Sequence, residues 1–275
     1  HGETLGTLSV GDVGLYKDAY APLLRQAVTV PSPDARNAAP GETATDVARR
    51  AAVDLEAYLD AHHAELAAFI VEPLVQGANG MVMYDPDYLW LARALCDRYG
   101  IHLIGDEIMV GFGRTGTLFA HEQAGIRPDF LCLSKGLTGG YLPLSVVMTT
   151  DAVYAAFYDD AVTRGFLHSH SYTGNPLACR AALATLDIFA EDQVLERNRR
   201  FAKRFTALLA PLVKHPRARN FRQCGMIWAA DIDVDDPHFR LRFYREALRR
   251  EVLLRPLGTT IYFMPPYILG DEDAV

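Results

Sequence analysis

The sequence predicts an α/β fold, with a mostly parallel sheet that carries helices on both faces, followed by part of a smaller α+β domain. Two observations support the larger domain: short apolar runs read as buried strands, and helical patterns alternate with them along the first two thirds of the chain. A third observation supports the smaller domain, because the pattern changes near residue 190. We therefore expect a cofactor-binding domain over 1–190 and part of a second domain over 191–275.

The elements of the first domain follow from local signals. Residues 31–43 are rich in proline and small residues and predict a loop. A helix over 45–62 would place Val47, Ala51, Leu55 and Leu59 on one face. In the next helix, Asp85 is expected as the N-cap and Pro86 as the first helical residue, with Gly100 just past the end. Apolar runs predict strands at 68–73, 101–107, 129–134 and 144–150.

The second half of the chain is predicted in the same way. Asn175 and Pro176 open a helix that extends to about Phe189, and another helix is expected over 194–213. Strands are expected within 225–232 and within 253–265. A helix at 237–252 lies between them, so this region mixes strands and helices.

Composition and charge exclude several classes of protein. Of the 275 residues, half are hydrophobic and 22% are charged, and the net charge is −7, so we expect no nucleic-acid or membrane partner. No apolar run approaches the roughly 18 residues that would span a bilayer. Four scattered cysteines indicate a reducing compartment, which predicts a cytoplasmic protein. Both ends of the sequence resemble cuts through a longer protein.

Charged residues follow three of the predicted strands. Glu72, Asp106 and Lys135 each stand at a strand's carboxyl end, where ligands bind in parallel α/β sheets. Lys135 lies between Ser134 and Gly136. A strand-end lysine can also simply extend its ammonium to solvent, and that alternative stays open on this stretch alone.

Other motifs in the sequence are weaker. The run 102–107 resembles a Walker B strand, but the sequence has no glycine-rich phosphate loop. The run 111–116 matches GxGxxG, but it does not directly follow its strand and lacks a suitably spaced acid. His168 and His170 have no third ligand at a sensible spacing, so we expect no metal.

One chemistry uses a strand-end lysine and a strand-end aspartate together. Pyridoxal phosphate forms a Schiff base with a lysine, and an acid keeps its pyridine nitrogen protonated so that the ring acts as an electron sink. Asp106 and Lys135 end consecutive predicted strands of this kind, and we expect one loop-and-helix crossover between them.

These residues carry a family resemblance. The runs "VEPLVQGANGM", "LIGDEIMVGFGRTGTLFA", "PDFLCLSKGLTGG" and "GNPLA" resemble the class III pyridoxal phosphate aminotransferases, which have fold type I. The tail "LLRPLGTTIYFMPPYIL" narrows the resemblance to one enzyme within this class. The resemblance covers almost the whole chain.

The resemblance implies roles for individual residues. Lys135 would be the covalent cofactor anchor and Asp106 the partner of the pyridine nitrogen, with Ile108 packed on the ring face. Ser171 would donate to the cofactor phosphate across the interface of a homodimer with shared active sites. Two residues would bind small-molecule substrates: Arg255 would hold a carboxylate, and Tyr262 would line the amino-donor pocket.

Alternatives remain for these roles. Arg255 could be a surface residue and Tyr262 a core aromatic, while Arg114 could simply hold its loop, so we leave Arg114 out of the site. The resemblance also implies that a phosphate-binding Gly-Ser turn and a ring-stacking aromatic lie before His1. The chain could instead act on an ω-amino acid or a semialdehyde, or be a noncatalytic homologue.

Overall fold

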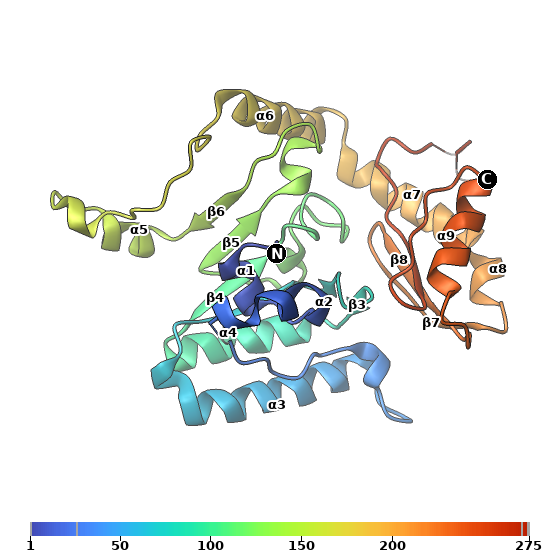
Figure 1. The fold of residues 1–275 in the computed structure, drawn as a ribbon, viewed down its shortest axis with the longest axis horizontal. Coiled ribbons are helices and arrows are strands. Elements are labelled where there is room, and N and C mark those ends of the chain that lie inside the picture. Colours follow the sequence, from blue (N-terminus) through green and yellow to red (C-terminus); the bar gives the residue numbers. More distant parts are fainter. Residues whose placement is uncertain (1, 26, 271, 274–275) are drawn as a thin grey trace.

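The computed structural model describes residues 2–25, 27–270 and 272–273. Figure 1 shows the arrangement of the elements. The α-helices are α1 (Leu5–Val10), α2 (Gly14–Lys17), α3 (Ala44–His62), α4 (Asp87–Tyr99), α5 (Asp151–Phe157), α6 (Pro176–Glu191), α7 (Val194–Leu208), α8 (Ala210–Val213) and α9 (Phe239–Arg249). The strands are β1 (Ala68–Val71), β2 (Val75–Gln76), β3 (Val82–Met83), β4 (His102–Asp106), β5 (Phe130–Leu133), β6 (Val146–Thr149), β7 (Ala218–Cys224), β8 (Ile227–Ile232) and β9 (Thr260–Phe263).

The larger sheet has the order β1-β4-β5-β6. Strands β1, β4 and β5 are parallel, and β6 pairs with β5 in the antiparallel sense. Figure 1 shows α6 on the opposite side of this sheet from α3 and α4. The predicted α/β fold with a mostly parallel sheet is therefore confirmed.

Helices α3 and α4 pack on one face of this sheet, and their sequences explain their ends. Thr43 and Asp46 form a reciprocal capping box at the start of α3. The predicted apolar face of α3 is buried, and each fully buried leucine stabilises the fold by roughly 1.5–3 kcal/mol. The predicted start of α4 was one residue early: Pro86 is the N-cap, and the Asp85 carboxylate accepts a hydrogen bond from Asp87 N at 2.9 Å.

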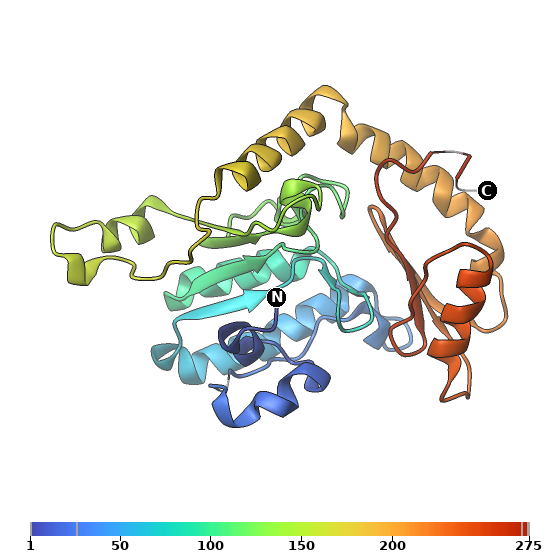
Figure 2. The same ribbon diagram turned by 45° about the horizontal axis from the view of Figure 1, so that its top comes forward.

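The smaller sheet is antiparallel, with the order β7-β8-β9, and Figure 2 shows it at the side of the larger sheet with α7 above it. Trp228 of β8 is fully buried and packs with Ala202 of α7. Two other β8 residues, Ile227 and Ala229, join the hydrophobic core beside the larger sheet. The two sheets therefore share buried apolar contacts.

Several predicted details were wrong. The crossover from β4 to β5 contains no α-helix, only the 3-10 turn Ala120–Ala124. The helix expected over 194–213 breaks at Leu209, just before Pro211, whose ring removes a backbone donor. Residues 252–256 are not a strand, since β9 begins only at Thr260. Within the described ranges, no helix is long and apolar enough to cross a membrane.

Candidate active site

The structure gathers three charged residues at one edge of the larger sheet. Glu72 directly follows β1, Asp106 ends β4, and Lys135 lies two residues beyond the end of β5. Because these three strands are adjacent and parallel, their carboxyl ends lie at the same edge. The charges of Asp106 and Glu72 both act on Lys135. The predicted juxtaposition of Lys135 and Asp106 is therefore present.

The small neighbours of Lys135 have structural reasons. Ser134 Oγ donates a hydrogen bond to Leu144 O at 2.7 Å, which fixes the strand end to the next segment. A Cβ atom on Gly136 would lie 2.8 Å from Phe112 Cβ, so only glycine permits this approach. Lys135 itself has a backbone φ of 44°, in the left-handed region that residues with a side chain rarely adopt. Such backbone conformations are concentrated at functional sites.

Burial and neighbouring charges act on two of the groups at this edge. Burial lowers the pKa of Lys135, although the carboxylates of Asp106 and Glu72 oppose the shift. Burial also raises the pKa of Glu72 to about 7, against the opposing effect of the Gly77 N–H, which donates to Glu72 Oε2 at 3.1 Å. Both shifts favour the neutral form of the group, as expected where water is partly excluded.

The adjacent residues Asp106 and Glu107 have different roles: Asp106 belongs to the candidate site, and Glu107 supports the fold around it. Asp106 is only 6% exposed, and its Oδ1 accepts a hydrogen bond from Ile108 N at 3.1 Å. Glu107 is fully buried and accepts hydrogen bonds from Ala120 N at 2.6 Å and His121 N at 2.9 Å. Glu107 therefore holds the long loop after β4, and Asp106 is the acid at the sheet edge.

The chemistry of this donor set fits pyridoxal phosphate. Lys135 supplies an amine whose lowered pKa favours the nucleophilic neutral form, and Asp106 supplies a buried carboxylate on the neighbouring strand. These two groups match the cofactor's aldehyde and ring nitrogen. Ile108 follows two residues after Asp106 and is half-buried, so its place beside the ring stays a prediction.

The other predicted site residues lie on different parts of the chain. Ser171 is exposed, on the segment after α5, which projects away from the sheet in Figure 1. Arg255 is also exposed, and it makes no ion pair with any residue that the structure describes. Tyr262 is half-buried on β9 and packs against the hydrophobic core beside the larger sheet. No described contact joins these three residues to Lys135.

The loop 111–116 connects the two sheets. Arg114 Nη1 donates to Pro265 O at 2.6 Å, and its guanidinium lies 4.4 Å from the centre of the Tyr267 ring. The Tyr267 hydroxyl donates to Phe112 O at 2.7 Å. These contacts support the structural alternative for Arg114. The loop therefore serves the joint between the sheets, and its match to a nucleotide motif is incidental.

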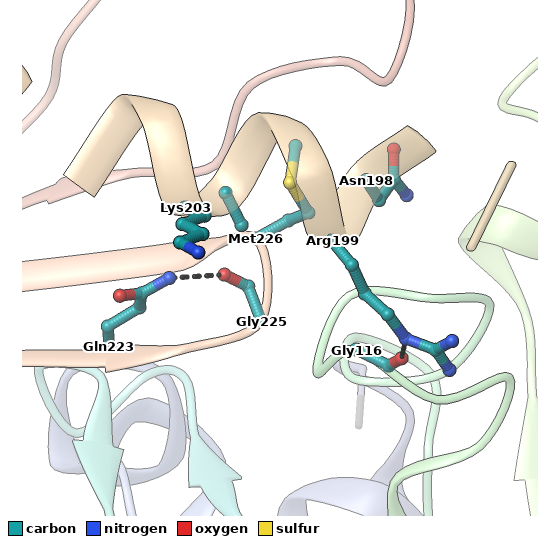
Figure 3. Close-up of a pocket in the computed structure, with 8 residues that line it drawn as sticks. Gly116, Asn198, Arg199, Lys203, Gln223, Gly225 and Met226 are labelled. Atoms are coloured by element: carbon teal, nitrogen blue, oxygen red, sulfur yellow. Dashed lines mark hydrogen bonds between the residues drawn. The ribbon is translucent and has the colours of Figure 1, made fainter. Parts of the chain in front are cut away.

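A cavity of about 250 Å³ lies elsewhere, between α7 and the turn that joins β7 to β8. Figure 3 shows its lining, where Arg199 donates to Gly116 O at 3.2 Å and Gln223 donates to Gly225 O at 3.1 Å. None of the predicted site residues lines it. This cavity is separate from the strand-end edge.

Sequence reasoning placed Glu72 at a strand end but did not include it in the site. Its elevated pKa depends on burial, and its carboxylate contacts the backbone of Gly77, neither of which a strand pattern reveals. Its position at the carboxyl end of a predicted strand, like the positions of Asp106 and Lys135, could have identified it.

The family model for class III aminotransferases matches residues 1–275, and the chain belongs to that family. Its members are pyridoxal phosphate enzymes of the transaminase type, in agreement with the strand-end lysine and aspartate.

Individual relatives narrow the comparison. The chain is 46% identical over 279 residues to the adenosylmethionine-8-amino-7-oxononanoate aminotransferase of Helicobacter pylori, covering 99% of this chain and 62% of that protein. It is 42% identical to the protein of the same name from Nitratidesulfovibrio vulgaris, covering 99% of this chain and 52% of that protein. The chain thus spans between half and two thirds of the length of these curated relatives.

Comparison with solved structures agrees with the assignment to the aminotransferase family. An omega transaminase from Pseudomonas jessenii in complex with PMP superposes with a TM-score of 0.92 at 28% identity, covering 100% of this chain and 63% of that one. The adenosylmethionine-8-amino-7-oxononanoate aminotransferase of Methanocaldococcus jannaschii gives 0.87 at 30% identity, again covering 100% and 63%. The fold is therefore that of a transaminase.

Proposed function

We propose that the natural full-length protein transfers an amino group to 8-amino-7-oxononanoate, forming 7,8-diaminononanoate in biotin biosynthesis, with S-adenosylmethionine as the donor. The names of the Helicobacter and Nitratidesulfovibrio relatives support this substrate pair. The observation that carries the reaction type is the position of Lys135 beside Asp106 at the ends of adjacent parallel strands.

The residues of the chain have distinct tasks in this proposal. Pyridoxal phosphate, when bound, supplies an electron sink for the negative charge left on the substrate carbon after its proton departs. Lys135 Nζ would hold the cofactor, and as a free amine it would accept that proton and return it at the neighbouring carbon. The Asp106 carboxylate would keep a proton at the ring nitrogen through a charge-assisted hydrogen bond.

We assign substrate binding to strand β9 of the smaller sheet and to the segment that precedes this strand. Arg255 is an exposed guanidinium without an ion-pair partner among the described residues, and it would bind the carboxylate of 8-amino-7-oxononanoate through two parallel hydrogen bonds. Tyr262 would line the pocket for the amino donor. This assignment makes residues 191–275 the substrate-binding part and residues 1–190 the cofactor-binding part.

A second copy of the chain is part of the proposal. Residues 141–172, which follow β5, expose many large apolar side chains, as surfaces that bind another protein do. They include Tyr141, Tyr158, Val162, Phe166, Leu167 and Tyr172, with exposed fractions of 69–90%. Ser171 lies within this segment, so a homodimer would cover the apolar surface and bring Ser171 to the cofactor phosphate of the second copy. We place this dimer in the cytoplasm, which the four free thiols support.

A second candidate function has its own support. The Pseudomonas jessenii neighbour is an omega transaminase and superposes over the entire chain, which favours an ω-amino acid or semialdehyde as an alternative substrate. Both candidates use Lys135 and Asp106 in the same way. They differ in what the Arg255 region must bind.

A substrate panel on the natural full-length protein tests the proposal. The panel offers S-adenosylmethionine, lysine and ω-amino acids as donors, with 8-amino-7-oxononanoate and its methyl ester as acceptors. We expect turnover with S-adenosylmethionine and a preference for the free acid over the ester. Turnover only with ω-amino acids would select the alternative. A protein that binds the cofactor but turns over none of these substrates would contradict both candidates.

The Arg255→Ala variant tests the carboxylate contact. Loss of one charge-assisted contact of this kind is worth about 1.5–3 kcal/mol, so kcat/KM for the free acid should fall roughly 10–100-fold while the ester changes little. Arg255→Lys should recover only part of the loss, because a point charge cannot form two parallel hydrogen bonds. A variant that keeps the full preference for the acid contradicts the assignment.

A further inference from the structure

We propose that Arg222 is a positioning residue for amino-donor binding: it fixes the loop 77–81 to the smaller sheet and thereby sets Tyr262 relative to the strand-end site. This inference rests on the proposed function, since it assigns a task within the same site. Arg222 lies on β7 and is not among the residues that the family resemblance implicates.

The guanidinium of Arg222 bridges the two domains through several hydrogen bonds. Its Nε donates to Met81 O at 2.8 Å and its Nη2 to Gly80 O at 2.6 Å, both in the loop between β2 and β3. Nη2 also donates to Asp231 Oδ1 at 3.0 Å on the neighbouring strand. The side chain is only 10% exposed, so these bonds are largely shielded from water. A lysine could not satisfy these acceptors together, because it lacks the planar array of donors.

Strand register places Arg222 in line with Tyr262. Arg222 pairs with Ala229 of β8, and Ala229 pairs with Tyr262 of β9. Directly opposed residues in antiparallel strands share one face of the sheet. Arg222 and Tyr262 therefore stand on the same face, separated by the small Ala229. Figure 1 shows β7 and β8 beside β3, so this face meets the larger domain.

The other end of the loop reaches the strand-end site. Gly77 N donates to Glu72 Oε2 at 3.1 Å. A Cβ atom on Gly77 would lie 2.3 Å from Met109 Sδ, so the loop is pressed against the segment that follows Asp106. Arg222 thus holds one end of a short loop whose other end touches Glu72 and Met109.

Asp231 extends this connection to all three strands of the smaller sheet. Its carboxylate accepts from Arg222, from Thr260 Oγ1 at 2.8 Å and from Asn220 Nδ2 at 2.9 Å. Arg36 of the larger domain lies 3.5 Å away and is itself paired with Asp34 at 2.7 Å. Thr260 stands two residues before Tyr262 on β9, so the same network that holds the loop also holds the strand that carries Tyr262.

A purely stabilising joint between domains would make the same contacts, so the test must separate stability from substrate binding. The variants Arg222→Lys and Arg222→Gln are made in the natural full-length protein, with Arg219→Gln as the control. Arg219 is on the same strand, but its ion pair with Asp233 is exposed. The donor and acceptor are whichever pair the wild-type protein turns over, so that an error in the proposed substrates does not decide this test.

We expect KM for the amino donor to rise about 10–100-fold in the Arg222 variants, as for a small misplacement of a binding group, with kcat changing less. Cofactor absorbance and the covalent link to Lys135 should remain, and the Arg219 control should match the wild type. If Arg222→Gln fails to fold, Arg222→Lys carries the test.

A double-mutant cycle with Tyr262→Phe gives the decisive readout. If Arg222 acts through Tyr262, the effects of Arg222→Lys and Tyr262→Phe on the donor KM should be less than additive. A lowered melting temperature with an unchanged donor KM, or fully additive effects in the cycle, would overturn the inference.

Discussion

The strand-end edge of the larger sheet is satisfied by contacts within its own chain, whereas the segment 158–174, which follows β6, leaves apolar side chains uncovered. At the edge, Asp106 and Glu107 are buried and Glu72 is half-buried, and all three accept hydrogen bonds from backbone N–H groups of their own chain. In the segment from 158 to 174, aromatic and aliphatic side chains are left in solvent. The first region is assembled by a single chain, whereas the second has surface that only another chain or segment can cover.

This difference indicates how the proposed activity is divided. The groups expected to hold the reactive end of the cofactor come from the region that is complete, and the hydroxyl expected at its phosphate, Ser171, comes from the region that is not. Substitutions in the first region should therefore affect chemistry directly, and substitutions in the second should act through assembly.

The largest expected effect is at Lys135. Lys135→Ala removes both the covalent anchor and the group that moves the proton, so activity should fall by at least roughly 10²–10⁴-fold. Borohydride reduction followed by peptide mapping should label Lys135 in the wild type. The chain has three other lysines, Lys17, Lys203 and Lys214, and Lys203→Ala is the matched control. A label on any other lysine would refute the assignment.

Asp106→Ala should come next. Losing a charge-assisted hydrogen bond to the ring nitrogen costs about 1.5–3 kcal/mol of cofactor affinity, and turnover should fall further because the electron sink weakens. Asp106→Asn keeps the shape without the charge and should lose turnover more than affinity. Near-normal turnover in the alanine variant would exclude this role for Asp106.

Much of the first region could be predicted from the sequence, for identifiable reasons. Apolar runs ending in Asp106 and near Lys135 mark parallel strands, and parallel strands end at one edge. Periodicity placed α3 correctly because its buried face is regular. Strand β7 was missed because a bulge between Arg219 and Arg222 breaks the alternation of its side chains.

Other features depend on contacts that sequence patterns do not encode. The raised pKa of Glu72 follows from burial, and the contacts of Arg222 join β7 to a loop some 140 residues away in sequence. The surroundings of Ser171 in the proposed enzyme depend on a second copy. Local patterns identify which residues end a strand, but not which distant segment covers them.

A charged substitution in the segment 158–174 tests whether this segment forms the dimer interface. Phe166→Glu should weaken dimer formation roughly 10–100-fold, because a carboxylate in an apolar interface lacks a partner. Sedimentation velocity at several concentrations measures this, and cofactor affinity should fall with the dimer. Trp90→Glu is the control, since Trp90 is similarly exposed but lies on α4. Equal dimer stability in both variants would contradict the proposed interface.

The smallest expected effect is a pH dependence of stability at Glu72. Burial, with a smaller contribution from the charge of Asp106, raises the pKa of this carboxyl from its ordinary 4.5 to about 7, against the opposing effects of the Gly77 N–H and of Lys135. Between these values the folded protein keeps a proton that the unfolded chain releases, so the free energy of unfolding should fall as pH rises from about 4.5 to 7.

Glu72→Gln should remove that loss and stabilise the cofactor-free protein above pH 7 by up to about 3 kcal/mol. Urea denaturation at pH 5 and pH 8 measures the difference, with Glu65→Gln as the control, because Glu65 is exposed. The glutamine can still accept the Gly77 N–H, so the effect isolates the charge from the hydrogen bond. If the glutamine variant shows the same pH dependence as the wild type, the Glu72 carboxyl is not held in its neutral form, and the edge of the sheet is less shielded from water than its burial indicates.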